Sequence, residues 1–413
     1  MLRTQTARPR YLRRVRTTEA QCNVMVSRRT LLASLFAAPC AAPRMLAAPA
    51  VPIMLPARRN DFQQLLVPAR IDGSAPLWCE LDSGGGGALV FIEAAKAAAI
   101  GIMPTSFGRS AGPLESAPAV DGRTRVALAF PGLKLPDQEL VIKANPLSGD
   151  KEASIGMLVL SRFVVELDHD SPAVKLHEPE NFRYSGPGRA FPFTIEANNP
   201  YTTATLTLRD GKEVTASLVI DTGAAGSIAY LSRSFAAEHR LAERAIGSAP
   251  DSLGRKACRL ERFALGPLGV ARPVVHHFLE PGFGGKTEPD GMIGMEFLRR
   301  FRVFFDYARS RMILEPNSRY TEASRFDASG LRVHRVAALP DAVRIYQVMP
   351  ETPAAEAGLQ ETDLIMAVDD TPVQRMSPGM VQEALAREGR ECRLLIQRGY
   401  DVFVVELKLR KLL

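Results

Sequence analysis

Two short segments of the sequence each end in an aspartate that is followed by a hydroxyl residue and a glycine. They are Cys79-Glu80-Leu81-Asp82-Ser83-Gly84 and Leu218-Val219-Ile220-Asp221-Thr222-Gly223. Two carboxyl groups in contact could hydrolyse an amide without a metal, because one ionised carboxylate would activate water while the other protonates the carbonyl oxygen. Like charges about 3 Å apart do not both ionise readily, so such a pair shares one proton near neutral or acidic pH.

The residues around these two aspartates repeat along the chain. Asp82 and Asp221 are 139 positions apart, and Gly156 and Gly294 are 138 positions apart. The other repeated residues are Ile155 and Met157 with Ile293 and Met295, Leu160 with Leu298, Arg162-Phe163 with Arg300-Phe301, and Asp168 with Asp306. A single Asp-x-Gly most often marks a turn. Two copies in register within a repeated scaffold instead indicate two half-domains of the same design, each of which contributes one aspartate.

The duplicated motif is similar to that of the retropepsin-like aspartic proteases in their bacterial, single-chain form. In that family Asp-(Thr/Ser)-Gly opens each half, and a segment of the pattern apolar-Ile-Gly-x-x-x-Leu packs behind the active-site loop. The resemblance covers about residues 55–317. It implies a mainly β fold with two retropepsin-like lobes in tandem, a catalytic dyad of Asp82 and Asp221, and neither a metal nor another cofactor.

The residues that accompany the two acids have physical roles in such a site. A small hydroxyl group, as in Ser83 and Thr222, can bond to the backbone of the opposite loop and lock the two loops together. Gly84 and Gly223 let backbone amides approach the carboxylates. Two further pairs are expected to form apolar walls that keep the acids dry and fixed, namely Ile155-Gly156 and Ile293-Gly294.

Alternation of apolar and polar residues predicts short strands in the same order in both halves. We assign the first half to residues 51–186 and the second to 187–318, with a Pro- and Gly-rich junction at 178–188. In the first half we expect strands at 62–71, 76–81, 123–130, 139–143, 164–167 and 173–176, and a helix at 92–99. In the second half we expect strands at 202–208, 214–220, 303–305 and 312–314, and a helix at 232–239.

Two segments rich in Gly, Ser and Pro stand between each aspartate and the strands that follow it. They are residues 106–116 and 247–257. The resemblance implies flap hairpins at these positions, and a plain surface loop is the alternative.

From about residue 327 the sequence resembles a PDZ domain. Residues 350–359 have the pattern of a helix that ends at Ala-Gly-Leu, and residues 363–369 have the pattern Asp-x-Ile-x-x-Val-Asp that starts the next strand. We assign a PDZ-like α/β module to 327–413, with a strand at 343–348, a helix at 377–387 beside a peptide groove, and two last strands within 392–407. The Gly-Leu-Gly-Phe-type loop that captures peptide carboxylates is poorly formed, with Ala338-Leu339-Pro340 near its place.

The positive charge of the chain is confined to its N-terminal segment. The formal net charge is +7, but residues 1–50 alone carry nine arginines and one glutamate, so the remainder has a net charge of −1. We therefore expect no nucleic-acid partner and no general attraction of the mature protein to a membrane surface.

The same N-terminal segment has the features of an export signal. Ser27-Arg28-Arg29-Thr30-Leu31-Leu32 is a twin-arginine motif, and the apolar stretch 31–42 is too short to span a membrane as a stable helix. Small residues before Val51 offer a cleavage site. These features predict a signal region at 1–50, export to the periplasm, and no membrane span after cleavage; a buried helix is the alternative. Residues 1–24 could be an upstream extension, since Met25 closely precedes the motif.

Other kinds of site find little support in the sequence. Nothing has metal-ligand spacing, and the adjacent His276 and His277 would point to opposite faces of a strand. The four glycines 84–87 are not a phosphate loop, because no Lys-Ser/Thr follows them. Three cysteines lie outside the signal region, so at most one intramolecular disulfide is possible among them: Cys79, Cys258 and Cys392.

We therefore expect an exported aspartic endopeptidase in which Asp82 and Asp221 activate water and cleave a peptide or protein substrate. The PDZ-like module would bind an extended peptide by strand addition and either present substrate or regulate the lobes. The alternative is a catalytically degenerate, peptide-binding adaptor of the same fold. The glycine run 84–87 favours the adaptor, because it lowers the rigidity of one acid loop, whereas retention of both acids and both hydroxyl residues favours the enzyme.

Overall fold

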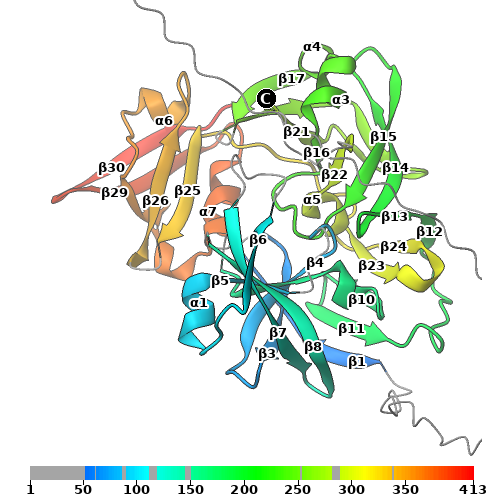
Figure 1. Cartoon of the computed structure of the whole chain (residues 1–413). Coiled ribbons are helices and arrows are strands. Elements are labelled where there is room, and N and C mark those ends of the chain that lie inside the picture. Colours follow the sequence, from blue (N-terminus) through cyan, green and yellow to red (C-terminus); the bar gives the residue numbers. More distant parts are fainter. Residues whose placement is uncertain are drawn as a thin grey trace, which may run out of the picture. The chain divides into compact units, whose positions relative to one another are not determined.

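Strands dominate the part of the chain that the computed structural model describes (Figure 1). This part comprises residues 52–60, 62–85, 90–110, 119–144, 150–251, 254–280, 289–336 and 339–413. The predicted signal region, its cleavage site and the glycines at 86 and 87 lie outside it. Within the described residues, no helix is both long enough and apolar enough to cross a membrane.

The first half is built around a sheet that closes on itself. Its order is β2-β3-β4-β9-β5-β8-β7-β6, and it closes because β3 also pairs with β7. The strands are β2 (Arg58–Arg59), β3 (Leu65–Ile71), β4 (Leu77–Asp82), β5 (Val90–Glu93), β6 (Ser106–Ser110), β7 (Ala119–Phe130), β8 (Leu133–Lys143) and β9 (Ala153–Gly156). The helices are α1 (Ala94–Ala99) and α2 (Met157–Leu160).

The helix predicted at 92–99 begins two residues later than expected. Ile92 instead belongs to β5, where it is fully buried and pairs in parallel with Ile142 of β8. A β-branched side chain packs well on a sheet surface, so this tertiary contact outweighs the helical pattern of the alanines that follow.

The second half repeats the layout of the first. In its described part the sheet order is β17-β18-β21-β16-β22-β15-β14-β19-β20, and β13 pairs with β14. The strands are β13 (Thr194–Glu196), β14 (Asn199–Thr207), β15 (Glu213–Ile220), β16 (Ala229–Leu231), β17 (Gly247–Asp251), β18 (Arg255–Arg259), β19 (Arg262–Leu265), β20 (Leu268–Ala271), β21 (Val274–Phe278) and β22 (Gly291–Ile293). The helices are α3 (Arg233–Glu238), α4 (Leu241–Arg244) and α5 (Met295–Leu298).

The strand that leads into each aspartate is central in its sheet. β4 runs parallel to β9, with Leu81 opposite Ile155, and β15 runs parallel to β22, with Ile220 opposite Ile293. Parallel strands that are covered on both faces read as continuous apolar runs rather than as alternating patterns. This arrangement brings each acid to the end of a buried strand, beside the glycine that precedes α2 or α5.

A third sheet contains strands from both halves and joins them. Its order is β1-β11-β10-β23-β24-β12. The strands are β1 (Ile53–Pro56), β10 (Val164–Asp168), β11 (Ala173–His177), β12 (Arg189–Pro192), β23 (Phe301–Asp306) and β24 (Arg311–Pro316), and the 3-10 turn η1 is Tyr307–Arg309. β10 and β23, which are the equivalent strands of the two halves, pair antiparallel at its centre, with Val165 opposite Phe305.

A buried charge network ties this third sheet together. Glu166 of β10 is buried, and its carboxylate accepts hydrogen bonds from Lys175 at 2.9 Å and from the Nε atom of Arg302 at 2.9 Å. Its other oxygen lies 2.7 Å from Nε2 of His177. These partners lower the pKa of Glu166 to about 2, although burial opposes the shift. Since Arg302 comes from the second half, the network bridges the two halves.

The C-terminal module has its own sheet and its own core. Its strands are β25 (Leu331–Val336), β26 (Leu339–Val348), β27 (Leu364–Val368), β28 (Thr371–Pro372), β29 (Glu391–Arg398) and β30 (Asp401–Lys408). Its helices are α6 (Pro353–Glu356), η2 (Val373–Arg375) and α7 (Pro378–Leu385). The edge strand β25, which contacts α7, was not predicted. Leu339 and Pro340 begin β26, so the placement of a carboxylate loop at 338–340 was wrong; the loop before the edge strand is 327–330.

Candidate active site

The two acid loops exchange hydrogen bonds through their hydroxyl residues. Ser83 donates its hydroxyl to the carbonyl oxygen of Ile220 at 2.7 Å, and Thr222 donates its hydroxyl to that of Leu81 at 2.5 Å. Each hydroxyl oxygen also accepts the other residue's backbone N–H, at 2.9 and 3.0 Å. Both side chains are buried. Every donor is therefore matched across the loops, which fixes one loop against the other.

The glycine after each hydroxyl residue allows the loops to approach closely. A methyl group placed on Gly84 would lie 2.4 Å from Cγ of Asp221, and one on Gly223 would lie 2.9 Å from Cγ of Asp82. The backbone N–H of Gly84 donates to Asp82 at 3.0 Å, and that of Gly223 donates to Asp221 at 2.7 Å. Ala224 adds a second amide donor to Asp221, at 3.1 Å. Each acid is thus held by its own loop and faces the glycine of the other.

The structure places the carboxyl groups of Asp82 and Asp221 side by side and hydrogen-bonded to each other. Both residues remain partly exposed. Burial of the carboxyl groups raises both pKa values, and at Asp221 the neighbouring charge of Asp82 raises the pKa further, well above its usual range. At Asp82 the ammonium of Lys151 opposes the shift. The pair is therefore suited to hold one shared proton, which belongs to the pair and not to either residue.

The predicted apolar walls lie directly behind the acids. Ile155 and Ile293 are fully buried in β9 and β22, and Gly156 is paired with Asp82 across β4 and β9. A methyl group on Gly294 would lie 2.4 Å from the carbonyl oxygen of Ser227, so this glycine is required by the close approach of the second acid loop. The backbone N–H of Asp221 donates to the carbonyl oxygen of Ile293 at 3.1 Å, which anchors the acid to this wall.

Three polar residues at the site were not predicted. The carboxylate of Glu80 is fully buried and pairs with the ammonium of Lys151. Gln64 donates to the other oxygen of Glu80 at 2.7 Å and to the carbonyl oxygen of Gly223 at 3.0 Å. A comparison of the two halves could have found Glu80, because the residue that stands two positions before the second aspartate is the apolar Val219.

A serine and a histidine meet next to the second acid loop. Nδ1 of His276 lies 2.9 Å from Oγ of Ser227, a contact that the sequence did not indicate. The Ser227 hydroxyl donates to the carbonyl oxygen of Ala229 at 2.8 Å, and both side chains are buried. This serine therefore supports the loop and is not exposed as a nucleophile. His277 is buried as well, so both faces of β21 are covered at the histidine pair.

Among the described residues, no group of three or more His, Cys, Asp or Glu side chains is placed to hold a metal ion. Cys79, Cys258 and Cys392 are free thiols and are buried. Burial raises the pKa of Cys79 to about 12, so its thiolate form is strongly disfavoured.

The two segments predicted as flaps both contribute to β-hairpins. β6 pairs antiparallel with β7, with Phe107 opposite Gly122, and β17 pairs antiparallel with β18. Residues 111–118 and 252–253 lie outside the described residues. The plain-loop alternative is thus wrong for the paired parts, while a flap role remains a prediction.

The loop before the edge strand β25 has its amides occupied internally. The carboxylate of Asp327 accepts the backbone N–H of Ser329 at 3.1 Å and that of Gly330 at 2.6 Å. The N–H of Leu331 donates to the Ser329 hydroxyl at 3.0 Å. Successive amides of this kind form a nest that binds carboxylates. Here the chain supplies that carboxylate itself.

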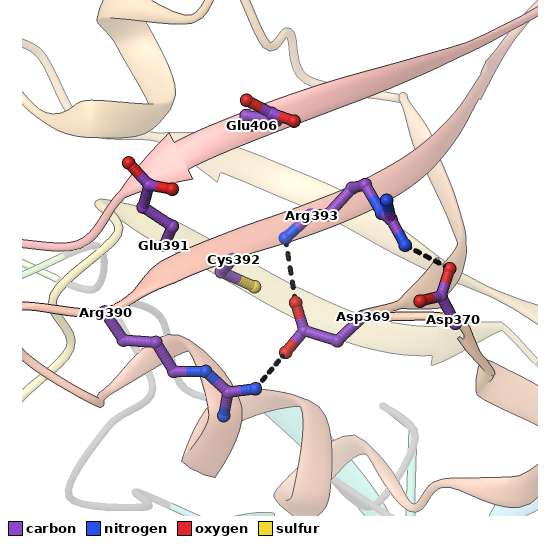
Figure 2. Close-up of a pocket in the computed structure, with 7 residues that line it drawn as sticks. All are labelled: Asp369, Asp370, Arg390, Glu391, Cys392, Arg393 and Glu406. Atoms are coloured by element: carbon purple, nitrogen blue, oxygen red, sulfur yellow. Dashed lines mark hydrogen bonds and ion pairs between the residues drawn. The ribbon is translucent and has the colours of Figure 1, made fainter.

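A polar pocket on the C-terminal module contains none of the acid-loop residues (Figure 2). Asp369 receives the backbone N–H of Arg393 at 2.9 Å and Nη2 of Arg390 at 2.7 Å. Arg393 also forms an ion pair with Asp370. Both arginines of the pocket are therefore paired with neighbouring aspartates.

Comparison with known proteins identifies the C-terminal module. A family model described as "PDZ domain" matches residues 344–398, which run from within β26 to the end of β29. The chain is therefore mainly β with a C-terminal PDZ domain. A solved structure, that of the aspartic proteinase from Irpex lacteus, is similar with a TM-score of 0.46 and 14% identity, over 66% of this chain and 100% of that chain. No curated protein matches the sequence.

Proposed function

We propose that the protein is an aspartic endopeptidase with Asp82 and Asp221 as its catalytic dyad. One observation carries the proposal: two carboxyl groups from duplicated loops are hydrogen-bonded to each other, and the loops are locked by reciprocal hydroxyl contacts. A pair of acids held in this way, partly exposed and with raised pKa values, is suited to share one proton.

The geometry supports a mechanism without a covalent intermediate. The ionised carboxylate of Asp82 would take a proton from water as the water oxygen attacks the peptide carbonyl carbon, and protonated Asp221 would give its proton to the carbonyl oxygen. Collapse of the tetrahedral intermediate returns that proton to Asp221 and breaks the C–N bond. The proton held by Asp82 passes to the leaving nitrogen. The dyad is thereby restored, and one water has been consumed.

Variants of the two acids test this proposal most directly. Hydrolysis of a proteome-derived peptide library should be measured for wild type, Asp82→Asn, Asp221→Asn and the double variant, with the exposed acid variant Asp210→Asn as a control. Each single variant should lose nearly as much activity as the double variant, because half a dyad can neither share a proton nor activate water. The pH profile of the wild type should be bell-shaped with an acidic optimum. Additive losses, or substantial activity in either single variant, would mean that the duplicated motif is only a scaffold.

We further propose that the PDZ domain binds an extended internal segment of a substrate or regulatory peptide by adding it to the edge strand β25. Occupation of the amide nest by Asp327 supports an internal segment rather than a free C-terminus.

We also propose export through the twin-arginine motif at Arg28 and Arg29, which lies outside the described residues. Replacement of both arginines by lysine should retain the protein in the cytoplasm with its signal uncleaved. Mass spectrometry of the mature protein should find an N-terminus near Val51, and a mature chain that still contains Arg28 would contradict the proposal.

A further inference from the structure

Gln64 of the first half reaches across to the second acid loop. It lies just before β3, and its side chain is buried. Its Nε2 atom carries two hydrogens, and it donates to Oε1 of Glu80 at 2.7 Å and to the carbonyl oxygen of Gly223 at 3.0 Å. The carbonyl oxygen of Thr222 lies 3.5 Å from the same atom. Gln64 thus links the two halves in addition to the reciprocal hydroxyl contacts.

The turn before β3 fixes the orientation of the Gln64 amide. Oδ1 of Asn60 accepts the backbone N–H groups of Phe62 and Gln64, at 3.0 and 2.9 Å. Nδ2 of Asn60 donates to Oε1 of Gln64 at 2.8 Å, and Asn60 is itself buried. Because Oε1 accepts this bond, the donor end of the Gln64 amide faces Gly223. If the amide turned over, Oε1 would lie against the carbonyl oxygen of Gly223, where two acceptors repel each other.

The contact with Gly223 acts on Asp221 through a single peptide unit. The carbonyl group of Gly223 and the N–H of Ala224 belong to the same planar unit, so the direction of one determines the direction of the other. That N–H donates to Oδ1 of Asp221 at 3.1 Å, and the N–H of Gly223 donates to the same oxygen at 2.7 Å. The backbone nitrogen of Ala224 also lies 3.3 Å from the carbonyl oxygen of Asp221. A small rotation of the peptide unit would therefore turn this amide away from the carboxyl group.

The two ends of this loop segment are held independently of Gln64. The backbone N–H of Thr222 donates to the hydroxyl oxygen of Ser83 at 3.0 Å. The carbonyl oxygen of Ala224 accepts the backbone N–H of Met295, at the start of α5, at 2.7 Å. The peptide unit whose carbonyl group Gln64 holds lies between these two anchors. Loss of the Gln64 amide should therefore release this one unit while the loop stays attached at both ends.

We propose that Gln64 is a positioning residue for Asp221. It holds the peptide unit between Gly223 and Ala224 so that the N–H of Ala224 stays on the carboxyl group and fixes its orientation beside Asp82. This inference rests on the proposed function of the dyad and deepens it, because it gives the first half a second means of orienting the acid of the second half.

Steady-state kinetics of peptide hydrolysis by Gln64→Met test this role. Methionine has a similar length but no donor, so the peptide unit is released. We expect kcat to fall by about tenfold or more with little change in KM, as when an interaction needed in the transition state is lost. Gln138→Met is the matched control, because Gln138 is also buried in the first half but donates to the carbonyl oxygen of Pro136 within its own strand, β8. This control should keep its kcat.

A second variant, Asn60→Ser, tests the orientation of the amide without altering Gln64. A serine hydroxyl can still accept a backbone N–H of the turn, but it is too short to donate to Oε1 of Gln64. The amide is then free to turn over and to lose its contact with Gly223, so kcat should fall here as well. If Gln64→Met does not fold, this variant decides the question, and a kcat equal to that of the wild type would overturn the inference.

A purely structural role of Gln64 would give a different result. A lower Tm with an unchanged kcat of the folded protein, or a higher KM at constant kcat, would overturn the inference. If the wild type hydrolyses no peptide, the proposed function fails, and ¹H–¹⁵N NMR then decides the positioning role by itself. The amide signal of Ala224 should follow the titration of the two acids in the wild type and in Gln138→Met, and it should lose this dependence in Gln64→Met. The same dependence in all three proteins would overturn the inference independently of activity.

Discussion

Ser83 and Thr222 are 139 positions apart, yet each donates its backbone N–H to the other's hydroxyl oxygen, at 2.9 and 3.0 Å. The two hydroxyl groups in turn donate hydrogen bonds to the carbonyl oxygens of Ile220 and Leu81. Because all four groups are buried, removal of either hydroxyl leaves a donor and an acceptor without partners. The contact is therefore expected to matter for both stability and activity.

Replacement of Thr222 by valine should weaken the protein more than its small change in volume suggests. Valine keeps the shape but leaves the N–H of Ser83 and the carbonyl oxygen of Leu81 unpaired, at a cost of ~1–3 kcal/mol for each buried group. Thr222→Ser is the matched control, since the first half uses serine at this position. Urea unfolding and peptidase assays should show a clear loss for valine and little change for serine. Equal behaviour of the two variants would contradict the reciprocal lock.

Gly84→Ala should abolish most activity while the protein still folds. The added methyl group would lie 2.4 Å from Cγ of Asp221, so the second acid must move away from the first. We expect a loss of about 100-fold, as for other displacements of reacting groups by roughly 1 Å. Gly211→Ala is a control with the opposite pattern: its φ of +78° disfavours alanine, but nothing lies near the site of the methyl group. That variant should lose stability and keep its activity.

Glu166 should make the fold sensitive to acid. Its pKa is lowered to about 2 in the folded state from an ordinary value of 4.5, so its ion pairs contribute stability above about pH 4.5. That contribution is lost as the pH falls from 4.5 towards 2, and it amounts to ~3 kcal/mol at most. Thermal unfolding of Glu166→Gln should show a lower Tm at pH 6 and a difference from wild type that shrinks towards pH 2. Glu139→Gln, which breaks a half-exposed pair with Arg123, should change Tm little at any pH.

The PDZ domain should not discriminate between free and amidated C-termini. Peptides that end in valine should bind the full-length protein equally well with a free or an amidated C-terminus. The reason is that Asp327 already occupies the amides of Ser329 and Gly330. Fluorescence anisotropy with a peptide library would measure this. Asp327→Ala frees these amides and should introduce a preference for the free carboxylate. A tenfold preference for the free acid in the wild type would show that Asp327 leaves the nest when a peptide binds.

The sequence was sufficient to locate the acids, because their placement follows from short local patterns. A buried apolar strand followed by Asp-(Thr/Ser)-Gly, repeated at a constant spacing, specifies where each acid lies in its half. The repeat also anticipated the hydroxyl residues and glycines, whose roles depend on the opposite loop. The catalytic assignment itself remains a proposal.

The features that the sequence did not reveal depend on long-range contacts. Glu80 and Lys151 are separated by 71 positions, and no periodicity links them. The contact between Ser227 and His276 arises only when β16 and β21 pair in the sheet. Ile92 has a helical pattern after it, and only its pairing with β8 makes it part of a strand. Local patterns therefore identified the motifs, whereas the polar surroundings that distinguish the two acids required the tertiary structure.

The pairing of β10 with β23 has a consequence for the timing of synthesis. When only the first half has been synthesised, the chain contains Asp82 but not yet Thr222, the partner of Ser83. Hydrolysis by the proposed dyad would begin only after Thr222 has emerged and the two central strands have met. With the proposed dyad, the order of translation would therefore delay hydrolysis until both halves have been made.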